Sequence, residues 1–390
     1  MDIDEVFPVQ RVARVAFIRT SDRITFRRCR RKFNWSYIHR ENLTGRKAKA
    51  PLWFGTGFHF AMEDYHGLRM FETPTDAFRA YVSACRRTPG FEMPSDWEEH
   101  LELGIGMFDY YAEWLGYRDP LVTLEVGGVP QVEVNFQVPI NLDPQFLNSL
   151  GYDRAVYTGT IDRVVLDDEG RIWLVDYKTA KAIQTSHLET DPQITAYCWA
   201  AQQIYNLPVA GFLYQQHRKV VAHEPAFLKS TKMFSVAKNQ LTTHTLYRNA
   251  LLKLYGDVTK APDANIAFLN ELAAQESQRA DSLIARNEVE RNQHQIDAEG
   301  PKIVLEAYDM LNPDLALYPN PTRDCSWDCD FRTACLNMDD GSDWVHEIEQ
   351  STINREEDDL SWRSRVQYPE LPEPLPRLHL ARLRRRQPPR

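Results

Sequence analysis

The chain has 390 residues, and its hydrophobic share of 43% and charged share of 26% are those of an ordinary globular protein. No apolar run approaches the roughly 20 residues that cross a bilayer, and the N-terminus lacks the apolar stretch of a signal peptide. We therefore exclude a membrane-spanning class and expect a cytoplasmic protein, built as two or three domains or as one core with insertions.

The net charge of -9 is unusual for a protein that binds nucleic acid, but phosphate contacts depend on local charge. One basic cluster contains Arg23, Arg27, Arg28, Arg30, Arg31 and Lys32. A second, in the tail, contains Arg377, Arg382, Arg384, Arg385, Arg386 and Arg390. Either run alone is more often a solvated face or a disordered tail. We nevertheless hypothesise that the tail binds DNA weakly and without sequence preference.

The N-terminal part predicts helices. Residues 21–40 read as one basic helix with Ser21 or Asp22 as its N-cap. The positions expected to face inward are Ile24, Cys29, Phe33 and Tyr37. Residues 52–66 predict a turn with two glycines that leads into a helix, and residues 97–116 predict a further amphipathic helix.

The pattern then changes to strands. Residues 132–140 alternate between apolar and polar side chains, with Glu133 on the polar face. Residues 157–166 and 171–177 predict two more strands, and Asp-Asp-Glu-Gly at 167–170 is a tight turn between them. We therefore expect a β-hairpin.

Beyond the hairpin, Asp191 is a good N-cap and Pro192 suits the first helical position, so a helix is expected to about residue 205. Residues 211–221 predict another strand. The range 230–310 is polar and helical in pattern. An apolar stripe on a charged helix there is formed by Leu272, Ala273, Ala280, Leu283 and Ile284. After about residue 350, Pro and Arg dominate, and we expect disorder.

Three side chains of the expected hairpin suggest catalysis. Asp162 lies on the first strand, and Asp176 and Lys178, two residues apart, point to one face of the second. Two carboxylates placed together repel one another, and a divalent cation relieves that repulsion. Such a cation polarises phosphate and activates water, while an ammonium stabilises developing charge. Asp-x-Lys alone is common by chance; the preceding acid and the apolar hairpin make the combination informative.

Gly159-x-x-Asp162, Asp176-Tyr-Lys178-Thr and Gln193-x-x-x-Tyr197 resemble the RecB-type branch of the PD-(D/E)XK nucleases, in particular the CRISPR-associated and phage-encoded exonucleases with an iron–sulfur cluster. Gly55-x-Gly-x-His59 matches an upstream motif of the same branch. The resemblance implies that His59, Asp162 and Asp176 hold Mg²⁺ or Mn²⁺, that Lys178 activates water or stabilises charge, and that Gln193 and Tyr197 position DNA. Additional site roles are open for Glu63, His66 and Glu133.

Three of the six cysteines fall within eleven residues, as Cys325-x3-Cys329-x5-Cys335. Three thiolates need a fourth ligand for Zn²⁺ or for a [4Fe–4S] cluster. Cys29 is the candidate, because one N-terminal and three C-terminal cysteines resemble the arrangement of the iron–sulfur nucleases. The x3 spacing departs from the usual x2 of that family, which keeps Zn²⁺ as the alternative. Cys198 is expected to pack as a small hydrophobe.

We accordingly predict an α/β fold with a restriction-endonuclease-like core, a mixed central sheet flanked by helices. The expected units are a nuclease core at 1–220, a helical insertion at 221–320, a cysteine segment at 321–345 that closes onto the core, and a disordered basic tail at 346–390. The resemblance implies an exonuclease acting on single-stranded DNA or DNA ends in recombination, repair or phage DNA processing. Two alternatives are an inactive nuclease-fold protein that binds DNA or a partner, and a zinc-stapled structural protein.

Overall fold

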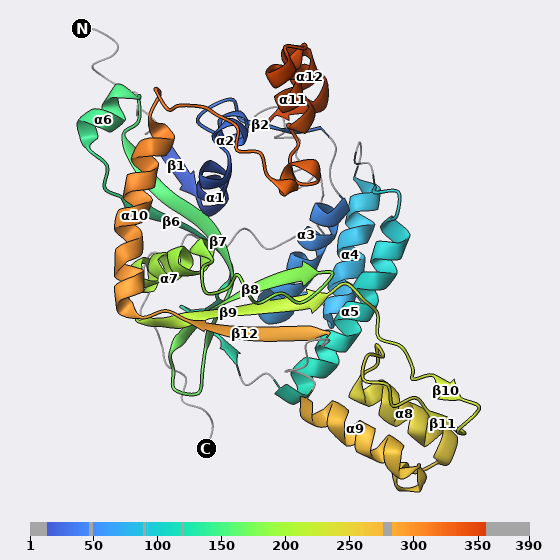
Figure 1. Ribbon diagram of the computed structural model, residues 1–390. Helices are drawn as coiled ribbons and strands as arrows, with labels where there is room; N and C mark the ends of the chain where they lie inside the picture. The colour runs from blue at the N-terminus through green and yellow to red at the C-terminus, as the bar shows by residue number, and fades with distance from the viewer. Residues whose placement is uncertain are drawn as a thin grey trace.

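The computed structural model of the protein describes residues 14–46, 50–88, 91, 93–118, 121–275 and 283–355. Its centre is a mixed sheet of seven strands, counted among these residues, in the order β1-β7-β8-β9-β12, with β3 and β6 also paired to β7 (Figure 1). These strands are β1 (Val15–Arg19), β3 (Val122–Thr123), β6 (Val132–Ile140), β7 (Arg154–Leu166), β8 (Ile172–Ala180), β9 (Val209–Arg218) and β12 (Ile284–Glu290). The pairs β1–β7 and β8–β9 are parallel and the others antiparallel.

Helices cover both faces of the sheet (Figure 1). The described helices are α1 (Thr20–Arg28), α2 (Arg30–Ser36), α3 (Ala50–Glu63), α4 (Pro74–Arg87), α5 (Trp97–Arg118), α6 (Pro144–Ser149), α7 (Pro192–Tyr205), α8 (His244–Tyr255), α9 (Asp263–Gln275), α10 (Gln293–Leu311), α11 (Arg332–Asp340) and α12 (Trp344–Ser351). On one face, α1, α2, α7 and α10 share a hydrophobic core with the sheet; on the other, α3, α4 and α5 share a second core. Strand β8 is buried from Ile172 to Tyr177 because side chains on both of its faces contribute to these cores. None of the described helices has the length and apolar character needed to cross a membrane.

The predicted fold class and most of the predicted core elements are confirmed. Strand β6 and helix α5 occupy the expected ranges, and β7 and β8 form the expected hairpin. Helix α7 begins as predicted, with Asp191 accepting a hydrogen bond from the Gln193 amide at 2.8 Å and Pro192 in the first turn. These elements carry strong local signals, either alternation with a tight turn or a capped amphipathic run.

The prediction of one helix over residues 21–40 is wrong. The chain is extended at Cys29, with φ of −158° and ψ of 113°, so that α1 ends and α2 begins around it. Ile24 is 38% exposed, and Phe26 is buried instead. Helix α1 therefore turns a different side inward from the one predicted, because the buried ion pairs of Arg23 occupy its inward side.

The predicted turn at Gly55 and Gly57 is also wrong, because both residues lie inside α3. A Cβ atom on Gly57 would lie 2.5 Å from Cε1 of Tyr81 in α4. Glycine is therefore required for the close approach of α3 and α4 rather than for a turn.

The range 230–310 is not the uniform run of helices that was expected. Among its described residues are the hairpin strand β11 (Met233–Phe234), which pairs with β10 (Phe227–Leu228), a 3₁₀ turn at Val258–Lys260, and strand β12. The predicted stripe does not form one helix, since α9 ends at Gln275 and Ile284 begins β12; Ala280 lies outside the described residues. Strand β12 pairs with β9, and α10 packs against α7 beside the sheet, so both belong to the central fold. The pairing of β12 is non-local, which a short polar segment does not reveal.

The C-terminal segment returns to the N-terminal region. Helix α12 covers residues 346–351, and strand β13 (Thr352–Asn354) pairs antiparallel with β2 (Leu43–Gly45), so the predicted disordered tail does not begin at residue 346 or at 350. A second short hairpin joins β4 (Glu125–Val126) to β5 (Val129–Pro130). The Arg-rich tail lies outside the described residues.

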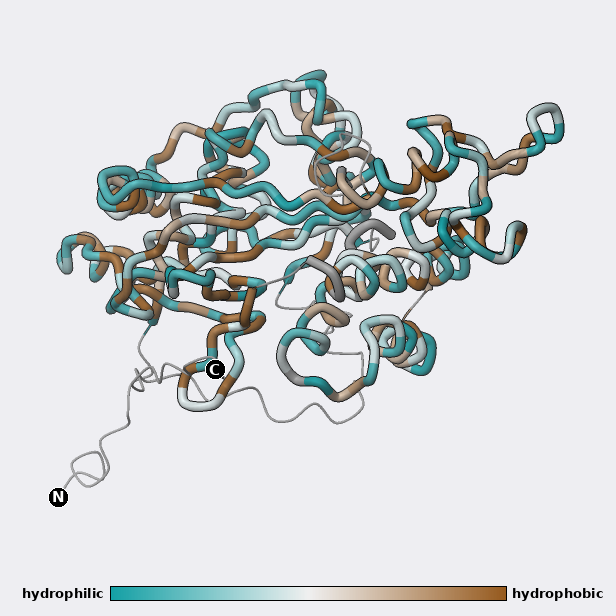
Figure 2. The backbone as a smooth tube through the Cα atoms, turned by 90° about the horizontal axis from the view of Figure 1, so that it is seen from below, coloured by the Kyte–Doolittle hydropathy of each residue, from teal (hydrophilic) through white to brown (hydrophobic). Residues whose placement is uncertain are grey.

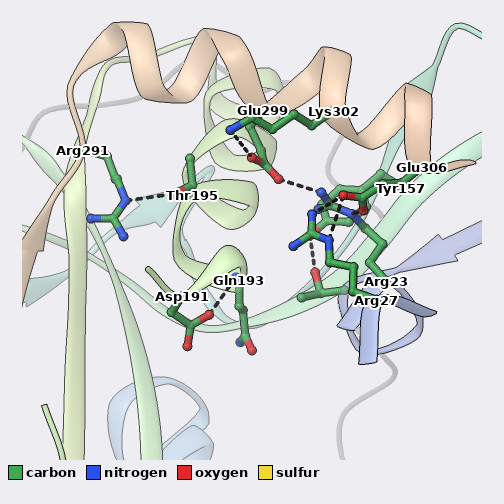
Figure 3. Close-up of polar contacts among 11 residues, drawn as sticks. Arg23, Arg27, Tyr157, Asp191, Gln193, Thr195, Arg291, Glu299, Lys302 and Glu306 are labelled. Carbon is green, nitrogen blue, oxygen red and sulfur yellow. Dashed lines mark hydrogen bonds and ion pairs between the residues drawn. The ribbon is translucent and has the colours of Figure 1, made fainter. Parts of the chain in front are cut away.

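Most of the N-terminal basic cluster is engaged in ion pairs within the chain. Arg23 binds Glu299 and Glu306 of α10 at 2.7 and 2.6 Å, and Arg27 also contacts Glu306 (Figure 3). Towards the cysteine segment, the ion pairs are Arg28–Asp324 at 2.9 Å, Arg28–Asp328 at 2.6 Å, Arg31–Asp339 at 2.8 Å and Lys32–Asp328 at 3.5 Å. These ion pairs hold α1 and α2 against the C-terminal part of the chain, so these basic side chains contribute little unpaired positive charge.

Candidate active site

The two hairpin aspartates lie where β7 and β8 separate. Ladder pairing runs from Leu166↔Ile172 to Arg163↔Val175 and ends there, one residue before Asp162 and Asp176. The Tyr177 amide donates a 2.7 Å hydrogen bond to Asp162 Oδ2. The Tyr177 amide fixes the orientation of the first carboxylate at the point where the ladder pairing ends.

Lys178 and Gln193 both hold the second carboxylate. Lys178 Nζ donates to Asp176 Oδ1 at 2.7 Å, and Gln193 Nε2 donates to the same oxygen at 3.1 Å. Gln193 reaches it from the first turn of α7. Figure 3 shows the Asp191 side chain that caps this turn at the Gln193 amide. Asp176 is almost completely buried, whereas 40% of the Lys178 side chain is exposed. The lysine therefore connects a buried acid with the open side of the site.

A third strand and a helix bring two more groups to Asp162. His59 Nδ1, from α3, lies 3.5 Å from Asp162 Oδ2 and 3.3 Å from Glu133 Oε1. The ligand atoms of His59, Glu133 and Asp162 all lie within 4.8 Å of one another. Among the described residues, this is the one group of three or more His, Cys, Asp or Glu side chains placed to hold a metal ion. The predicted metal set was His59, Asp162 and Asp176; in the structure Glu133 belongs to the group and Asp176 does not.

Glu133 has a strained backbone. Its φ is +44°, and the β6–β7 ladder passes from Val132↔Arg163 to Val134↔Ile161 without a pair between them. Glu133 thus lies opposite Asp162 in register, with its side chain turned towards His59. Positive φ is costly for a residue other than glycine, and such strain concentrates at functional sites.

The electrostatics of the group favour a cation. Burial raises the pKa of Asp162; the charge of Glu133 raises it further, and His59 opposes the increase. Burial also raises the pKa of Asp176, and the charge of Asp162 raises it further. Burial alone would lower the pKa of His59, but Asp162 and Glu133 outweigh it and raise that pKa to about 9. A proton on His59 thus supplies Asp162 and Glu133 with the positive charge that a bound metal ion would supply.

The remaining predicted residues fall into two groups. Tyr197 lies beside the site: a Cβ on Gly159 would be 2.8 Å from its Oη, and Asp176 and Asp162 add to the effect of burial in raising its pKa to about 12. His66 does not reach the carboxylates. Its Nε2 lies 2.6 Å from Tyr111 Oη, its ring stacks on Tyr177, and burial lowers its pKa well below the ordinary value.

Two nearby residues received little or no weight from the sequence. Tyr214 pairs with Asp176 in the parallel β8–β9 register, and burial together with Asp176 raises its pKa to about 12. Glu63, one helical turn after His59, has a pKa raised to about 7 by burial and by the charges of Glu133 and Asp64. The signal for Glu63 was its i, i+4 spacing from His59; Tyr214 had none, because strand register is non-local.

The two segments that carry the four predicted cluster cysteines contact each other through Lys32 and the Asp328 carbonyl at 2.9 Å, but no three of these thiols lie within 4.8 Å of one another. Burial raises the pKa of Cys329, and the charges of Cys325 and Cys29 add to this effect. Cys335 Sγ accepts a 3.1 Å hydrogen bond from Arg31, two residues after Cys29. Cys85 and Cys198 lie apart in α4 and α7 and are buried, as predicted for Cys198.

A family model described as the PD-(D/E)XK nuclease superfamily matches residues 21–336. This match spans most of the chain, and the protein belongs to that superfamily. A search of curated proteins gives no significant match. Among solved structures, one titled "Crystal structure of SSO0001" is similar, with 12% sequence identity over 82% of this chain and 85% of that chain, and a TM-score of 0.31.

The donor set fits the divalent cation that this superfamily implies. An imidazole and two carboxylates within 4.8 Å of one another suit Mn²⁺ or Mg²⁺, which prefer oxygen ligands and retain waters. Asp176 Oδ2 is buried and accepts no hydrogen bond from the described residues, although Lys178 Nζ lies 2.7 Å away. The Lys178 ammonium already faces this oxygen, so the fit to a divalent cation rests on His59, Glu133 and Asp162.

Proposed function

We propose that the protein is a Mg²⁺- or Mn²⁺-dependent exonuclease of the RecB-type branch that hydrolyses single-stranded DNA or DNA ends. The observation that carries the proposal is the convergence of His59, Glu133 and Asp162 beside the Asp176–Lys178 pair. This arrangement combines a cation site with an exposed ammonium, which is what phosphodiester hydrolysis requires.

Each residue has a role that follows from its position. His59, Asp162 and Asp176, with Glu133, would hold the cation, which when bound polarises the phosphate and lowers the pKa of water. Lys178 supplies positive charge to the oxygens of the scissile phosphate or orients the attacking water.

Around these groups, Gln193 keeps Asp176 oriented through its 3.1 Å hydrogen bond. Tyr197 lies on the same face of α7, one helical turn later, where its hydroxyl can contact DNA.

The function is tested with end-labelled linear and covalently closed circular single-stranded DNA. We expect loss of the linear strand with Mg²⁺ or Mn²⁺, survival of the circle, and no loss with EDTA. Cutting of the circle would replace the exonuclease by an endonuclease. If neither substrate is degraded with either metal, the inactive DNA-binding alternative is favoured.

We further propose that Cys29, Cys325, Cys329 and Cys335 hold a [4Fe–4S] cluster that joins the two ends of the nuclease domain. The contact between the two cysteine-bearing segments supports a shared ligand, and four thiolates are the ligand set of such clusters. Zn²⁺ is the alternative with the same ligands.

Protein purified without oxygen is expected to be brown and to contain four irons per cluster. Cys329→Ser should lose the colour and most of the iron, and should unfold at lower urea concentration. Cys85→Ala, outside the four, is the control and should keep both. A colourless wild-type protein with one zinc would assign the zinc alternative, and equal iron in the Cys329 variant would refute the ligand set.

A further inference from the structure

The chain between β9 and β12 forms a unit attached at one end of the sheet. The Arg218 amide donates to the Leu283 carbonyl at 2.9 Å, and Ile284 pairs with His217, so both connections lie at the carboxyl end of β9. Lys178 pairs in register with Gln216 at this same end. The unit therefore begins within three residues of the partner of the candidate catalytic lysine.

This unit has its own small core and stands apart from the sheet. Helices α8 and α9 enclose Tyr247, Leu251, Ala261, Phe268, Leu269 and Leu272. In both views the helices and the β10–β11 hairpin lie to one side of the molecule (Figures 1 and 2). Substitutions on the surface of the unit should leave the active-site core intact.

The first part of the unit is basic in an acidic protein. Residues 219–255, here termed the basic module, contain six lysines and arginines and one acidic residue, Glu224, whereas the whole chain has a net charge of -9. The basic residues are Lys219, Lys229, Lys232, Lys238, Arg248 and Lys253. A local excess of this kind creates the positive potential that overall charge conceals.

Most charges of the module are exposed and unpaired, unlike those of the N-terminal cluster; Lys219 is half-buried, with its ammonium 5.1 Å from the centre of the Phe54 ring. Lys229, Lys232, Arg248 and Lys253 are exposed. Within the described part of the chain these four have no acidic partner, whereas Lys238 pairs with Glu271 of α9 at 2.9 Å. Their positive charge is therefore available to a ligand.

Apolar side chains stand next to these charges at the hairpin. All residues from 227 to 232 are exposed, and Phe227 is 45% exposed, with its ring in a T-shaped contact with that of Phe234. An exposed aromatic ring among lysines is the combination that binds unpaired nucleic acid, since lysines contact phosphates and the ring stacks on a base.

We propose that the basic module binds the backbone of the DNA strand beside the active site, with Phe227 stacking on an unpaired base. The inference rests on the proposed function for the identity of the ligand. It assigns substrate binding to a unit that holds none of the metal-site residues. On binding, the DNA phosphates replace the counterions of the exposed lysines.

The test compares two variants with equal loss of charge. Lys229→Gln, Lys232→Gln and Lys253→Gln are combined in one protein, and Arg79→Gln, Arg154→Gln and Lys302→Gln in the control. The control residues are exposed and lie on α4, β7 and α10. Fluorescence anisotropy measures binding of labelled single-stranded DNA over a range of salt concentrations, with Ca²⁺ in place of Mg²⁺ or Mn²⁺ to prevent cleavage.

We expect the module variant to lose roughly tenfold or more in affinity and to lower the slope of log Kd against log salt by about 2, given about 0.7 per phosphate contact on single strands. The control should remain close to wild type, and Lys→Arg replacements at the three module positions should preserve binding. Phe227→Ala should weaken binding to single strands more than to blunt duplex.

Equal loss of affinity in module and control variants, or no loss in either, would overturn the inference; in the second case an acidic protein becomes the better partner for this surface. The proposed function fails separately, if wild-type protein binds DNA but does not degrade it with Mg²⁺ or Mn²⁺. The binding measurement therefore keeps the two outcomes apart.

Discussion

Replacement of Lys178 by alanine is expected to slow DNA hydrolysis by roughly a hundred- to ten-thousand-fold while the protein still binds Mn²⁺. The ammonium lies 2.7 Å from Asp176 and 40% of its side chain is exposed, so it can face a phosphate. Asp176 raises the pKa of Lys178, with Asp162 adding to this, and together they outweigh the opposing effect of burial. With Asp162 and Asp176 ionised, the residue is a cation at neutral pH, which favours charge stabilisation over proton abstraction.

The measurement combines single-turnover cleavage of labelled DNA with titration of Mn²⁺ in the absence of substrate. Lys178→Arg should recover part of the rate, because it keeps the charge but changes the geometry. Lys302→Ala, on the exposed face of α10, removes a lysine outside the site and should cleave normally. Asp162→Asn should lose both Mn²⁺ binding and cleavage, and a Lys178→Ala protein with the wild-type rate would show that the lysine has no part in the chemistry.

Local sequence was sufficient for the part of the site carried by the hairpin. The Asp167-to-Gly170 turn and the alternation around it fix β7 and β8, and the spacing of two places Asp176 and Lys178 on one face. The cap at Asp191 likewise brings Gln193 to Asp176. Each of these relations depends on residues close together in the chain.

The parts that sequence did not predict depend on non-local pairing. Glu133 meets Asp162 because β6 and β7 pair in one register and the ladder is interrupted at a residue with positive φ. Alternation indicated a strand but not its partner. In the same way, Ile284–Glu290 carries a weak strand pattern, and its pairing with β9 decides its conformation.

The environment of the basic residues of α1 could not be predicted from the sequence either. Their charge suggested an exposed surface, but their acidic partners lie almost 300 residues away. Arg23 binds Glu299 and Glu306, and Arg28 binds Asp324 and Asp328. A run of arginines looks the same in sequence whether it meets phosphate or carboxylate. The acids that neutralise this run are spread over α10 and the cysteine segment, so no local pattern marks them.

Among the arginines of α1, the buried Arg23 should have the largest effect on the stability of the protein. Arg23 is 1% exposed, Glu299 is 3% exposed, and the guanidinium also lies 5.7 Å from the centre of the Tyr157 ring. Replacing Arg23 by alanine removes the buried cation from both carboxylates and leaves Glu306 with the more exposed Arg27 and Glu299 with Lys302 at 3.6 Å. Removal of one partner from a buried ion pair costs roughly 3–5 kcal/mol. The urea concentration at half-unfolding should fall accordingly.

Two further variants separate the cost of the buried charges from the loss of packing. Arg27→Ala removes a 38% exposed arginine that shares Glu306, and an exposed pair contributes only about 0–1 kcal/mol. Arg23→Met combined with Glu299→Gln and Glu306→Gln removes the uncompensated charges and should recover part of the stability that Arg23→Ala loses. If Arg23→Ala and Arg27→Ala unfold at the same urea concentration, the buried ion pairs do not hold α1 to α10, and the attachment of the N-terminal helices must depend on apolar packing and on the cysteine segment instead.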